Sequence, residues 1–280
     1  MTEYYAGIDI GSTMTKAVIM NEAILASVMG PTGAEHRKLA NRVMAEALAQ
    51  ANLSFEDITY VVATGYGRIN VPFADKQITE ISCHAKGVAS LLPTAGTVID
   101  IGGQDCKGIK LSHGRVVDFV MNDKCAAGTG RFIEVIAEAL GVKLEDMGEL
   151  SLTATNAVQI SSTCTVFAEQ EIVSQLSQGV PLADLTAGLH EALAARIYGM
   201  VSRIKIEKDV VVTGGGAKNT GLVKALENKL GYPVLLPPEP LLTGAIGAAL
   251  LGKDRAQQAL KSGSPLPSRE RKLQEATFFT

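Results

Sequence analysis

A short segment occurs twice in this chain, and this repetition constrains the fold more than any other feature of the sequence. Residues 8–18 read IDIGSTMTKAV and residues 99–109 read IDIGGQDCKGI, so that Asp, Gly and Lys positions align. Each copy is an apolar run, an Asp-Ile-Gly turn and a second apolar run, which predicts two strands joined by a tight glycine turn. Because the unit recurs about once per half of the chain, the sequence predicts a duplicated fold with two similar lobes.

The remaining sequence alternates between strand and helix patterns, which indicates an α/β fold. We expect strands over residues 58–63, 116–121, 210–213 and 234–236, and helices over 34–51, 130–140, 182–206, 222–230 and 242–251. With 280 residues, 46% of them hydrophobic, the chain is large enough for two lobes. We expect a first lobe over 1–95 and a second over 96–253. Residues 254–280 are charged and rich in Ser and Pro, so they are expected to form a tail or extension.

Composition excludes several classes of function. The formal net charge is −3 with no basic cluster, which argues against a nucleic-acid partner. No apolar run reaches the roughly 18 residues of a membrane span, and the N-terminus does not resemble a signal peptide. Four cysteines are too few for a disulfide framework in a chain of this length, so reduced thiols and a cytoplasmic location are expected.

The glycine turns suit phosphate binding. Without Cβ atoms, the backbone N–H groups of such a turn can approach phosphate oxygens closely. Hydroxyls beside the turn can donate to the same oxygens, and a lysine can balance their charge, although Lys16 could instead point into solvent. The candidate phosphate-binding residues are Gly11, Ser12, Thr13, Lys16, Gly102 and Gly103.

Acidic and amide side chains complete the predicted phosphate chemistry. Asp9 and Asp100 are candidate anchors for Mg²⁺, which is usually held through retained waters. Gln104 or Asp105 could orient an attacking water, because phosphoryl transfer requires positioning more than covalent chemistry. These two are the candidate catalytic residues.

A third glycine segment follows the expected strand over 210–213. Its glycines lie between a strand and a helix, a context suited to packing a nucleotide against the backbone. The candidate residues are Gly214, Gly215, Gly216, Lys218 and Asn219. A lone glycine turn is a weak signal, but two matched turns, this segment and the small-residue run over 243–249 together predict a nucleotide site.

The order of these motifs resembles that of the superfamily of actin, sugar kinases and heat-shock chaperone ATPases. Residues 9–16 resemble its first phosphate motif, 100–105 the second, 211–219 the adenosine motif and 244–252 the connecting helix. The resemblance covers about residues 4–252. It implies two lobes of duplicated topology with ATP and Mg²⁺ in the cleft between them.

Two of the four cysteines stand in contexts that suggest a second chemistry. Cys83 and Cys106 lie in an expected helix and strand, and a free cysteine there is usually a small buried hydrophobe. Cys125 and Cys164 each directly precede an expected helix, over residues 126–140 and 165–178. A helix N-terminus stabilises a thiolate, which suits a metal ligand, although helix capping by small residues is an open alternative. His84, beside Cys83, has no second residue pair at metal-ligand spacing.

The segments around Cys125 and Cys164, together with the Asp-Ile-Gly-Gly-Gln-Asp turn, resemble the activator ATPases (component A) of 2-hydroxyacyl-CoA dehydratases. That family includes the ATP-binding subunits of benzoyl-CoA reductase. The resemblance implies that Cys125 and Cys164 hold one four-iron four-sulfur cluster across a homodimer, two thiolates from each protomer. It further implies ATP hydrolysis coupled to electron transfer, from ferredoxin or flavodoxin to a dehydratase or related iron–sulfur reductase, in an anaerobic host.

Three alternatives remain open at the level of the sequence. The chain could be a subunit of a benzoyl-CoA reductase complex rather than a detached activator. It could be a small-molecule kinase of the same fold, in which Asp100 or Asp105 deprotonates a hydroxyl. It could also be a filament or scaffold ATPase related to actin, in which case assembly would depend on nucleotide.

Overall fold

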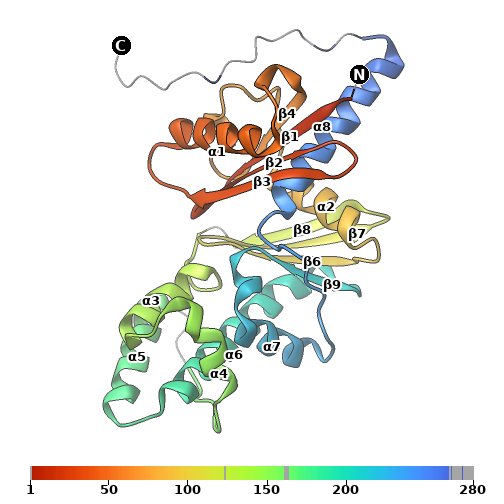
Figure 1. The fold of residues 1–280 in the computed structure, drawn as a ribbon. Helices are drawn as coiled ribbons and strands as arrows, with labels where there is room; N and C mark the ends of the chain where they lie inside the picture. Colours follow the sequence, from red (N-terminus) through yellow and green to blue (C-terminus); the bar gives the residue numbers. More distant parts are fainter. Residues whose placement is uncertain (1, 123, 161–163, 265, 267–272, 274–280) are drawn as a thin grey trace. The chain divides into compact units, whose positions relative to one another are not determined.

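The chain forms two compact units, each built around its own β-sheet (Figure 1). The computed structural model describes residues 2–122, 124–160, 164–264, 266 and 273. The first unit comprises residues 1–93, 113–115 and 241–280, and the second comprises 94–112 and 116–240, counting the described residues of each range. The second boundary therefore differs from the expected one, because residues 241–253 belong to the first unit.

The first unit contains a sheet with the strand order β3-β2-β1-β4-β5. Strands β1, β2 and β3 run antiparallel to one another, whereas β4 is parallel to β1, and β5 to β4. Their bounds are β1 Tyr4–Ile10, β2 Met14–Met20, β3 Ile24–Pro31, β4 Ile58–Thr64 and β5 Lys76–Gln77.

Helices of the first unit pack on this sheet because β1 and β4 are apolar on both faces. These helices are α1 His36–Ala51, α2 Glu80–Leu91 and α8 Thr243–Ser262. The apolar stripe of α1, including Val43 and Met44, packs against Ile8 and Ile10. Residues of α8 instead share a cluster with Tyr5 and Val62. The single-turn 3₁₀ helices are Phe55–Asp57 and Arg68–Asn70.

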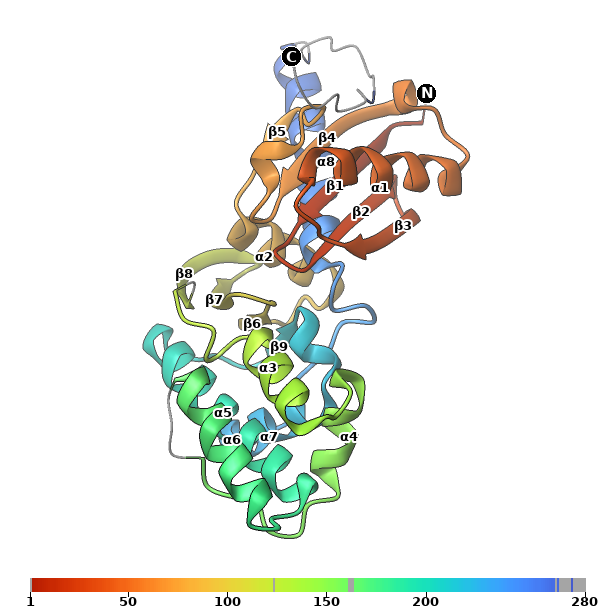
Figure 2. The same ribbon diagram turned by 90° about the vertical axis from the view of Figure 1, so that its left-hand side faces the viewer.

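The second unit contains a sheet with the strand order β8-β7-β6-β9, and its helices gather on one side of that sheet (Figure 2). Strands β6 and β7 are antiparallel, whereas β9 is parallel to β6. The strands are β6 Thr97–Ile101, β7 Cys106–Ser112, β8 Arg115–Asn122 and β9 Val210–Thr213. The helices are α3 Gly130–Leu140, α4 Met147–Leu152, α5 Thr165–Ser177, α6 Leu182–Val201 and α7 Thr220–Leu230, with 3₁₀ turns at Leu144–Asp146, Ser202–Ile204 and Gly215–Lys218. One core joins sheet residues such as Ile99 and Val212 to helix residues such as Ile136 and Leu193.

The predicted duplication is confirmed strand by strand. In the first unit Asp9 pairs with Lys16 across β1 and β2, and in the second Asp100 pairs with Lys107 across β6 and β7. Both turns close with the same backbone hydrogen bond, Gly11 N–H to Met14 O at 3.1 Å and Gly102 N–H to Asp105 O at 2.9 Å. Each hairpin also has a parallel third strand, β4 or β9, beside its first strand.

Two expected elements differ from those observed. Residues 234–236 form only an isolated bridge between Leu235 and Val211 rather than a strand. The helix expected over 242–251 continues to Ser262, because Gly252 lies buried against Tyr60 and does not end it. The first part of the predicted tail is therefore helix, and residues 265, 267–272 and 274–280 lie outside the described residues. None of the helices in the described ranges is both long and apolar enough to span a membrane.

Candidate functional site

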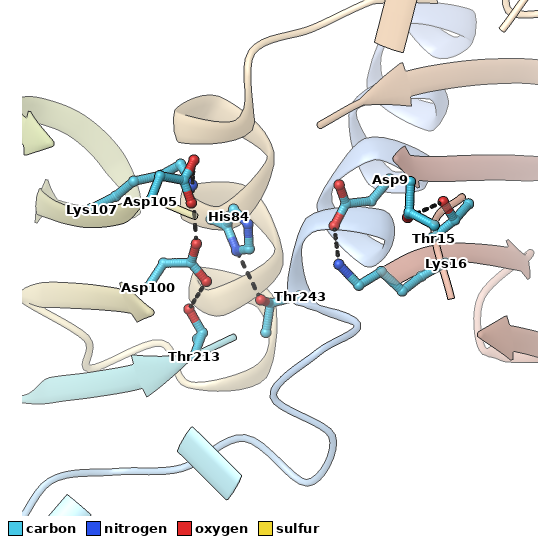
Figure 3. A network of polar contacts seen from close by, with 10 residues as sticks. Asp9, Thr15, Lys16, His84, Asp100, Asp105, Lys107, Thr213 and Thr243 are labelled. Atoms are coloured by element: carbon cyan, nitrogen blue, oxygen red, sulfur yellow. Dashed lines mark hydrogen bonds and ion pairs between the residues drawn. The ribbon is translucent and has the colours of Figure 1, made fainter. Parts of the chain in front are cut away.

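The first Asp-Ile-Gly turn carries a buried ion pair. The β1–β2 register places Asp9 opposite Lys16, and Lys16 Nζ lies 3.1 Å from Asp9 Oδ2 (Figure 3). Only 3% of Asp9 and 8% of Lys16 is exposed. The Lys16 side chain therefore points at the Asp9 carboxylate rather than into solvent, and its positive charge compensates the charge of Asp9 directly.

The second turn repeats this pair and adds two partners. Lys107 Nζ lies 3.3 Å from Asp100 Oδ2 and 2.8 Å from Asp105 Oδ2. The Thr213 hydroxyl donates to Asp100 Oδ1 at 2.8 Å, so both oxygens of this carboxylate are held (Figure 3). Lys107 was not among the candidate residues, although the repeat aligned it with Lys16.

A Thr-Gly pair lies at the end of β4 and another at the end of β9, and each pair packs on the aspartate of its own unit, Asp9 or Asp100. Thr64 lies beside Asp9 in the β1–β4 register, as Thr213 lies beside Asp100. The glycines that follow, Gly65 and Gly214, have φ of +87° and +78°, and a Cβ at either would meet the aspartate Oδ1. Thr64 and Gly65 were missed, although residues 61–65 read VVATG and residues 210–214 read VVVTG.

The turn residues between the strands remain accessible. Gly11, Ser12, Gly102 and Gly103 are half-buried, whereas Thr13 and Gln104 are exposed. Each turn therefore offers backbone N–H groups, hydroxyls or an amide above a buried carboxylate, as a phosphate site requires.

The glycine segment after β9 divides into packed and open positions. A Cβ at Gly216 would clash with the Ile101 side chain, whereas one at Gly215 would meet no atom within 4 Å. The exposed backbone at Gly215 is thus open to a ligand. Lys218 forms an ion pair with Glu239 at 3.1 Å.

Asn219 has a structural role at the start of α7. Its Oδ1 accepts a hydrogen bond from the Leu222 N–H at 2.9 Å, which caps the helix. Its Nδ2 lies 3.1 Å from His190 Nε2 on α6. Burial lowers the pKa of His190 to about 4, so the ring is neutral at physiological pH and can accept from the amide. His190 had no role in the sequence-based prediction.

Burial separates Cys83 and Cys106 from the other two cysteines, as predicted. Both are fully buried, Cys83 on α2 and Cys106 at the start of β7. Burial raises the pKa of Cys83 to about 12. Burial also raises the pKa of Cys106 far above the usual value for a thiol.

Cys125 and Cys164 are accessible thiols in different settings. Cys164 is exposed and is the N-cap residue of α5, as expected. Cys125 is half-buried and lies five residues before α3, so the expectation that it directly precedes a helix is wrong. Residues 126–129 form a turn instead, in which Gly128 has a φ of +105°.

The Cys125 turn is held by two side chains. Asn122 Nδ2 donates to the carbonyls of Cys125 and Ala127 at 2.9 and 3.0 Å. Arg196 Nη2, from α6, lies 3.5 Å from Cys125 Sγ. A guanidinium at this distance can donate a hydrogen bond to the sulfur.

The start of α3 is attached to the second glycine turn. The Gly130 N–H donates to Gly102 O and the Arg131 N–H donates to Gly103 O, both at 2.8 Å. A Cβ at Gly130 would lie 3.1 Å from Gly102 O, so this contact favours glycine. The turn that carries Asp105 and the turn that carries Cys125 are therefore joined through the first residues of one helix.

The residues fit Mg²⁺ and an iron–sulfur cluster only with additional ligands. Among the described residues, no group of three or more His, Cys, Asp or Glu side chains is placed to hold a metal. Mg²⁺ commonly binds through one or two carboxylates, waters and substrate phosphates, which suits the isolated aspartates of the two turns. A four-iron cluster takes four thiolates, and one chain offers two accessible ones. His84 forms a hydrogen bond within the first unit instead of a metal site.

The chain is similar over nearly its whole length to activators of 2-hydroxyacyl-CoA dehydratases. It is 50% identical over 258 residues to "Activator of lactoyl-CoA dehydratase" of Anaerotignum propionicum, covering 91% of this chain and 99% of that protein. The crystal structure of (R)-2-hydroxyglutaryl-CoA dehydratase component A from Acidaminococcus fermentans matches with a TM-score of 0.88 at 46% identity, covering 91% of this chain and 99% of that one. The activator of the 2-hydroxyisocaproyl-CoA dehydratase from Clostridium difficile, with bound ADPNP, matches with a TM-score of 0.87 at 46% identity, covering 92% of this chain and 97% of that one.

More distant likenesses are found both by sequence and by structure. One of the benzoyl-CoA reductase subunits of Thauera aromatica is 32% identical over 271 residues, covering 92% of this chain and 96% of that protein. A ROK family glucokinase from Streptomyces griseus matches with a TM-score of 0.55 at 15% identity, covering 90% of this chain and 99% of that one, which shows the fold alone. The expected actin and sugar-kinase type of fold is thereby confirmed.

A family model supports the assignment over most of the chain. The model described as the BadF/BadG/BcrA/BcrD ATPase family matches residues 6–252, a range that contains both glycine turns, the third glycine segment and the two accessible cysteines. The chain therefore belongs to the BadF/BadG/BcrA/BcrD ATPase family.

Proposed function

We propose that this ATPase is an activator that delivers a low-potential electron to a 2-hydroxyacyl-CoA dehydratase or a related iron–sulfur reductase. Support comes from relatives that are named as activators and share 46% and 50% identity over nearly their whole length. The identity to the benzoyl-CoA reductase subunit is lower, at 32%, which favours the detached activator over a subunit of that complex.

The nucleotide chemistry belongs to the two turns and the third glycine segment. The N–H groups and hydroxyls of Ser12 and Thr13 would bind phosphate in the space left by Gly11, and Asp9 and Asp100 would hold Mg²⁺ through its waters. Gln104, which is exposed on the second turn, would orient the attacking water. Asp105 lies in an ion pair with Lys107, so it would act by holding that lysine and the turn in place.

The second chemistry belongs to the two accessible thiols. Cys125 and Cys164 would bind half of a four-iron four-sulfur cluster, and a second copy of the chain would complete it. When bound, the cluster would supply a one-electron carrier, loaded by ferredoxin or flavodoxin. Asn122 would keep the Cys125 turn in shape, and Arg196 would donate to the Cys125 sulfur.

One observation supports the proposal beyond resemblance: the start of α3 is bonded to the second glycine turn and follows the Cys125 turn. Its first N–H groups bind the carbonyls of Gly102 and Gly103, and the turn before it carries Cys125. A change in the second turn on nucleotide binding would therefore be transmitted through Gly130 to the cysteine turn.

The test is iron and acid-labile sulfide per chain after strictly anaerobic purification. We expect about two of each, lost in air, from one cluster shared by a homodimer. Cys125→Ala and Cys164→Ala should abolish iron binding and electron delivery, whereas Cys83→Ala, at a buried thiol, should retain the iron. Iron absent from the unaltered protein that still hydrolyses ATP would contradict the proposal and make a screen for a phosphorylated small molecule the next step.

A further inference from the structure

We propose that His84 is a positioning residue for the candidate Mg²⁺ anchor Asp9, acting through the first turn of α8. The inference rests on the proposed role of Asp9, and it adds a residue that takes no part in the nucleotide chemistry described above. All of the groups involved lie in the first unit.

His84 is a buried polar side chain. It lies on α2, 6% exposed, and its Nδ1 is 2.9 Å from the hydroxyl of Thr243, which is fully buried (Figure 3). Burying two polar groups costs free energy unless they bond to each other. A core that needed only packing would have apolar side chains at these positions.

Thr243 is the first residue of α8, and the residue after it lies against Asp9. A Cβ at Gly244 would be 3.0 Å from Asp9 Oδ2 and 3.2 Å from His84 Nε2, so the carboxylate and the imidazole face the same point from two sides. In Figure 3 the Asp9 carboxylate extends from β1 toward the place where His84 and Thr243 meet. Glycine at 244 allows this approach.

The surrounding backbones also approach closely. A Cβ at Gly247 would clash with the carbonyl of Cys83, and one at Gly87 would clash with the carbonyl of Thr243. The start of α8 therefore lies directly against α2, and one of the two contacts is with Cys83, the residue that precedes His84. In this rigid setting, the hydrogen bond between His84 and Thr243 fixes where Gly244 meets Asp9.

The duplicated unit supplies an internal comparison. In the second unit, the Thr213 hydroxyl holds the second oxygen of Asp100. The matching Thr64 hydroxyl is buried and makes no hydrogen bond with any described residue. Asp9 thus receives no such bond from Thr64, and the first turn of α8, held by His84, lies beside its Oδ2, the oxygen that Lys16 also contacts.

The test measures Mg²⁺ dependence in the full chain with two readouts. These are Mg²⁺-dependent equilibrium binding of a fluorescent ADP analogue and the Mg²⁺ concentration at half-maximal ATP hydrolysis. We expect His84→Ala to raise both Mg²⁺ requirements by up to about 10-fold, less than for a direct partner of a metal ligand, because His84 acts on Asp9 only through the start of α8. Thr243→Val should reproduce the effect, and the double variant should be no worse than either single one.

Conservative variants separate positioning from packing. His84→Asn places an amide near the Nδ1 position and should restore the contact with Thr243 and most of the Mg²⁺ affinity. His84→Gln places its amide near Nε2 and should not. Val88→Ala, which truncates another fully buried residue of α2, should lower the melting temperature and leave the Mg²⁺ requirement unchanged.

The outcomes separate this inference from the proposed function. If Asp9→Asn leaves the Mg²⁺ requirement unchanged, the proposed role of Asp9 is wrong. If Asp9→Asn raises it and His84→Ala does not, only the inference about His84 is overturned. Restoration by His84→Gln instead of His84→Asn would also overturn it, because the acting atom would then be Nε2.

Discussion

Accessibility gives the four cysteines two different chemistries within one chain. A thiol reacts as its thiolate, and burial raises the pKa of Cys83 to about 12 and raises the pKa of Cys106 as well. At pH 8 both are therefore protonated and shielded. Cys125 and Cys164 are open to solvent in the single chain.

Alkylation should reveal this division directly. In the folded, iron-free protein at pH 8 we expect iodoacetamide to modify Cys125 and Cys164 rapidly, and Cys83 and Cys106 only after denaturation. Peptide mass spectrometry over time would measure the four rates. Rapid modification of Cys106 in the folded protein would contradict the burial on which this prediction rests.

The burial of one histidine between two helices makes the stability of the second unit sensitive to pH. His190 on α6 contacts Asn219, the N-cap residue of α7, and burial lowers the pKa of His190 to about 4. In the unfolded chain the histidine titrates near its ordinary value of about 6.5. Between these values the unfolded state binds more protons, so stability falls as the pH falls.

The expected loss is a few kcal/mol, because each unit of pKa difference corresponds to about 1.4 kcal/mol. Urea unfolding at pH 7.5 and pH 5 should show it in the unaltered protein. In His190→Gln, which keeps an acceptor for Asn219 without a titrating ring, the difference should shrink. An unchanged pH dependence in this variant would show that other groups cause it.

Local patterns predicted the elements with strong periodicity and missed those that depend on distant partners. The helix over 130–140 and the strand over 210–213 were predicted with their observed bounds, because their apolar residues recur at the helical or strand period. Strand β3, Ile24–Pro31, was not predicted, since much of it is exposed and its order comes from pairing with β2. The full length of α8 was missed because Gly252 and the charged residues after it resemble a helix end.

At the scale of the whole molecule, the duplication was predictable and the division into units was not. The repeat around Asp9 and Asp100 specified two matching hairpins, and the structure contains both. Residues 241–262 return to the first unit because α8 packs on β1 through Gly7, where a Cβ would clash with Ala245 O. Gly7 and Ala245 are far apart in the sequence, so no local sequence pattern predicts their contact. The Thr-Gly pairs form a second repeat, VVATG and VVVTG, in the sequence. The residues that follow the two copies differ, so the repeat was not used in the prediction.

The proposed coupling between ATP hydrolysis and electron delivery belongs to the scale of the whole molecule, and one added methyl group should disturb it. In Gly130→Ala the Cβ would lie 3.1 Å from Gly102 O and would push the start of α3 away from the second turn. We expect ATP hydrolysis to persist while fewer electrons reach the dehydratase per ATP. Both rates can be measured in one anaerobic assay with the partner enzyme.

Gly199→Ala is the matched control for this experiment. Gly199 lies in α6, and a Cβ there meets no atom within 4 Å, so alanine should increase stability by about 0.5–1 kcal/mol through helix propensity. It should leave the ratio of electrons to ATP unchanged. Equal ratios in the Gly130 variant and the control would indicate that α3 does not connect the two chemistries.

The ion pairs within the turns would also decide which form of a nucleotide binds at the proposed site. Lys16 neutralises Asp9, and Lys107 is shared between Asp100 and Asp105, so the first group has no net charge and the second is negative. Neither lysine is left over to offset the charge of a polyphosphate. A nucleotide without a cation would therefore be repelled by the carboxylates, while its magnesium complex would be attracted to them. In the proposed site the turns would thus discriminate against the free nucleotide, and the cation would be required for nucleotide binding as well as for hydrolysis.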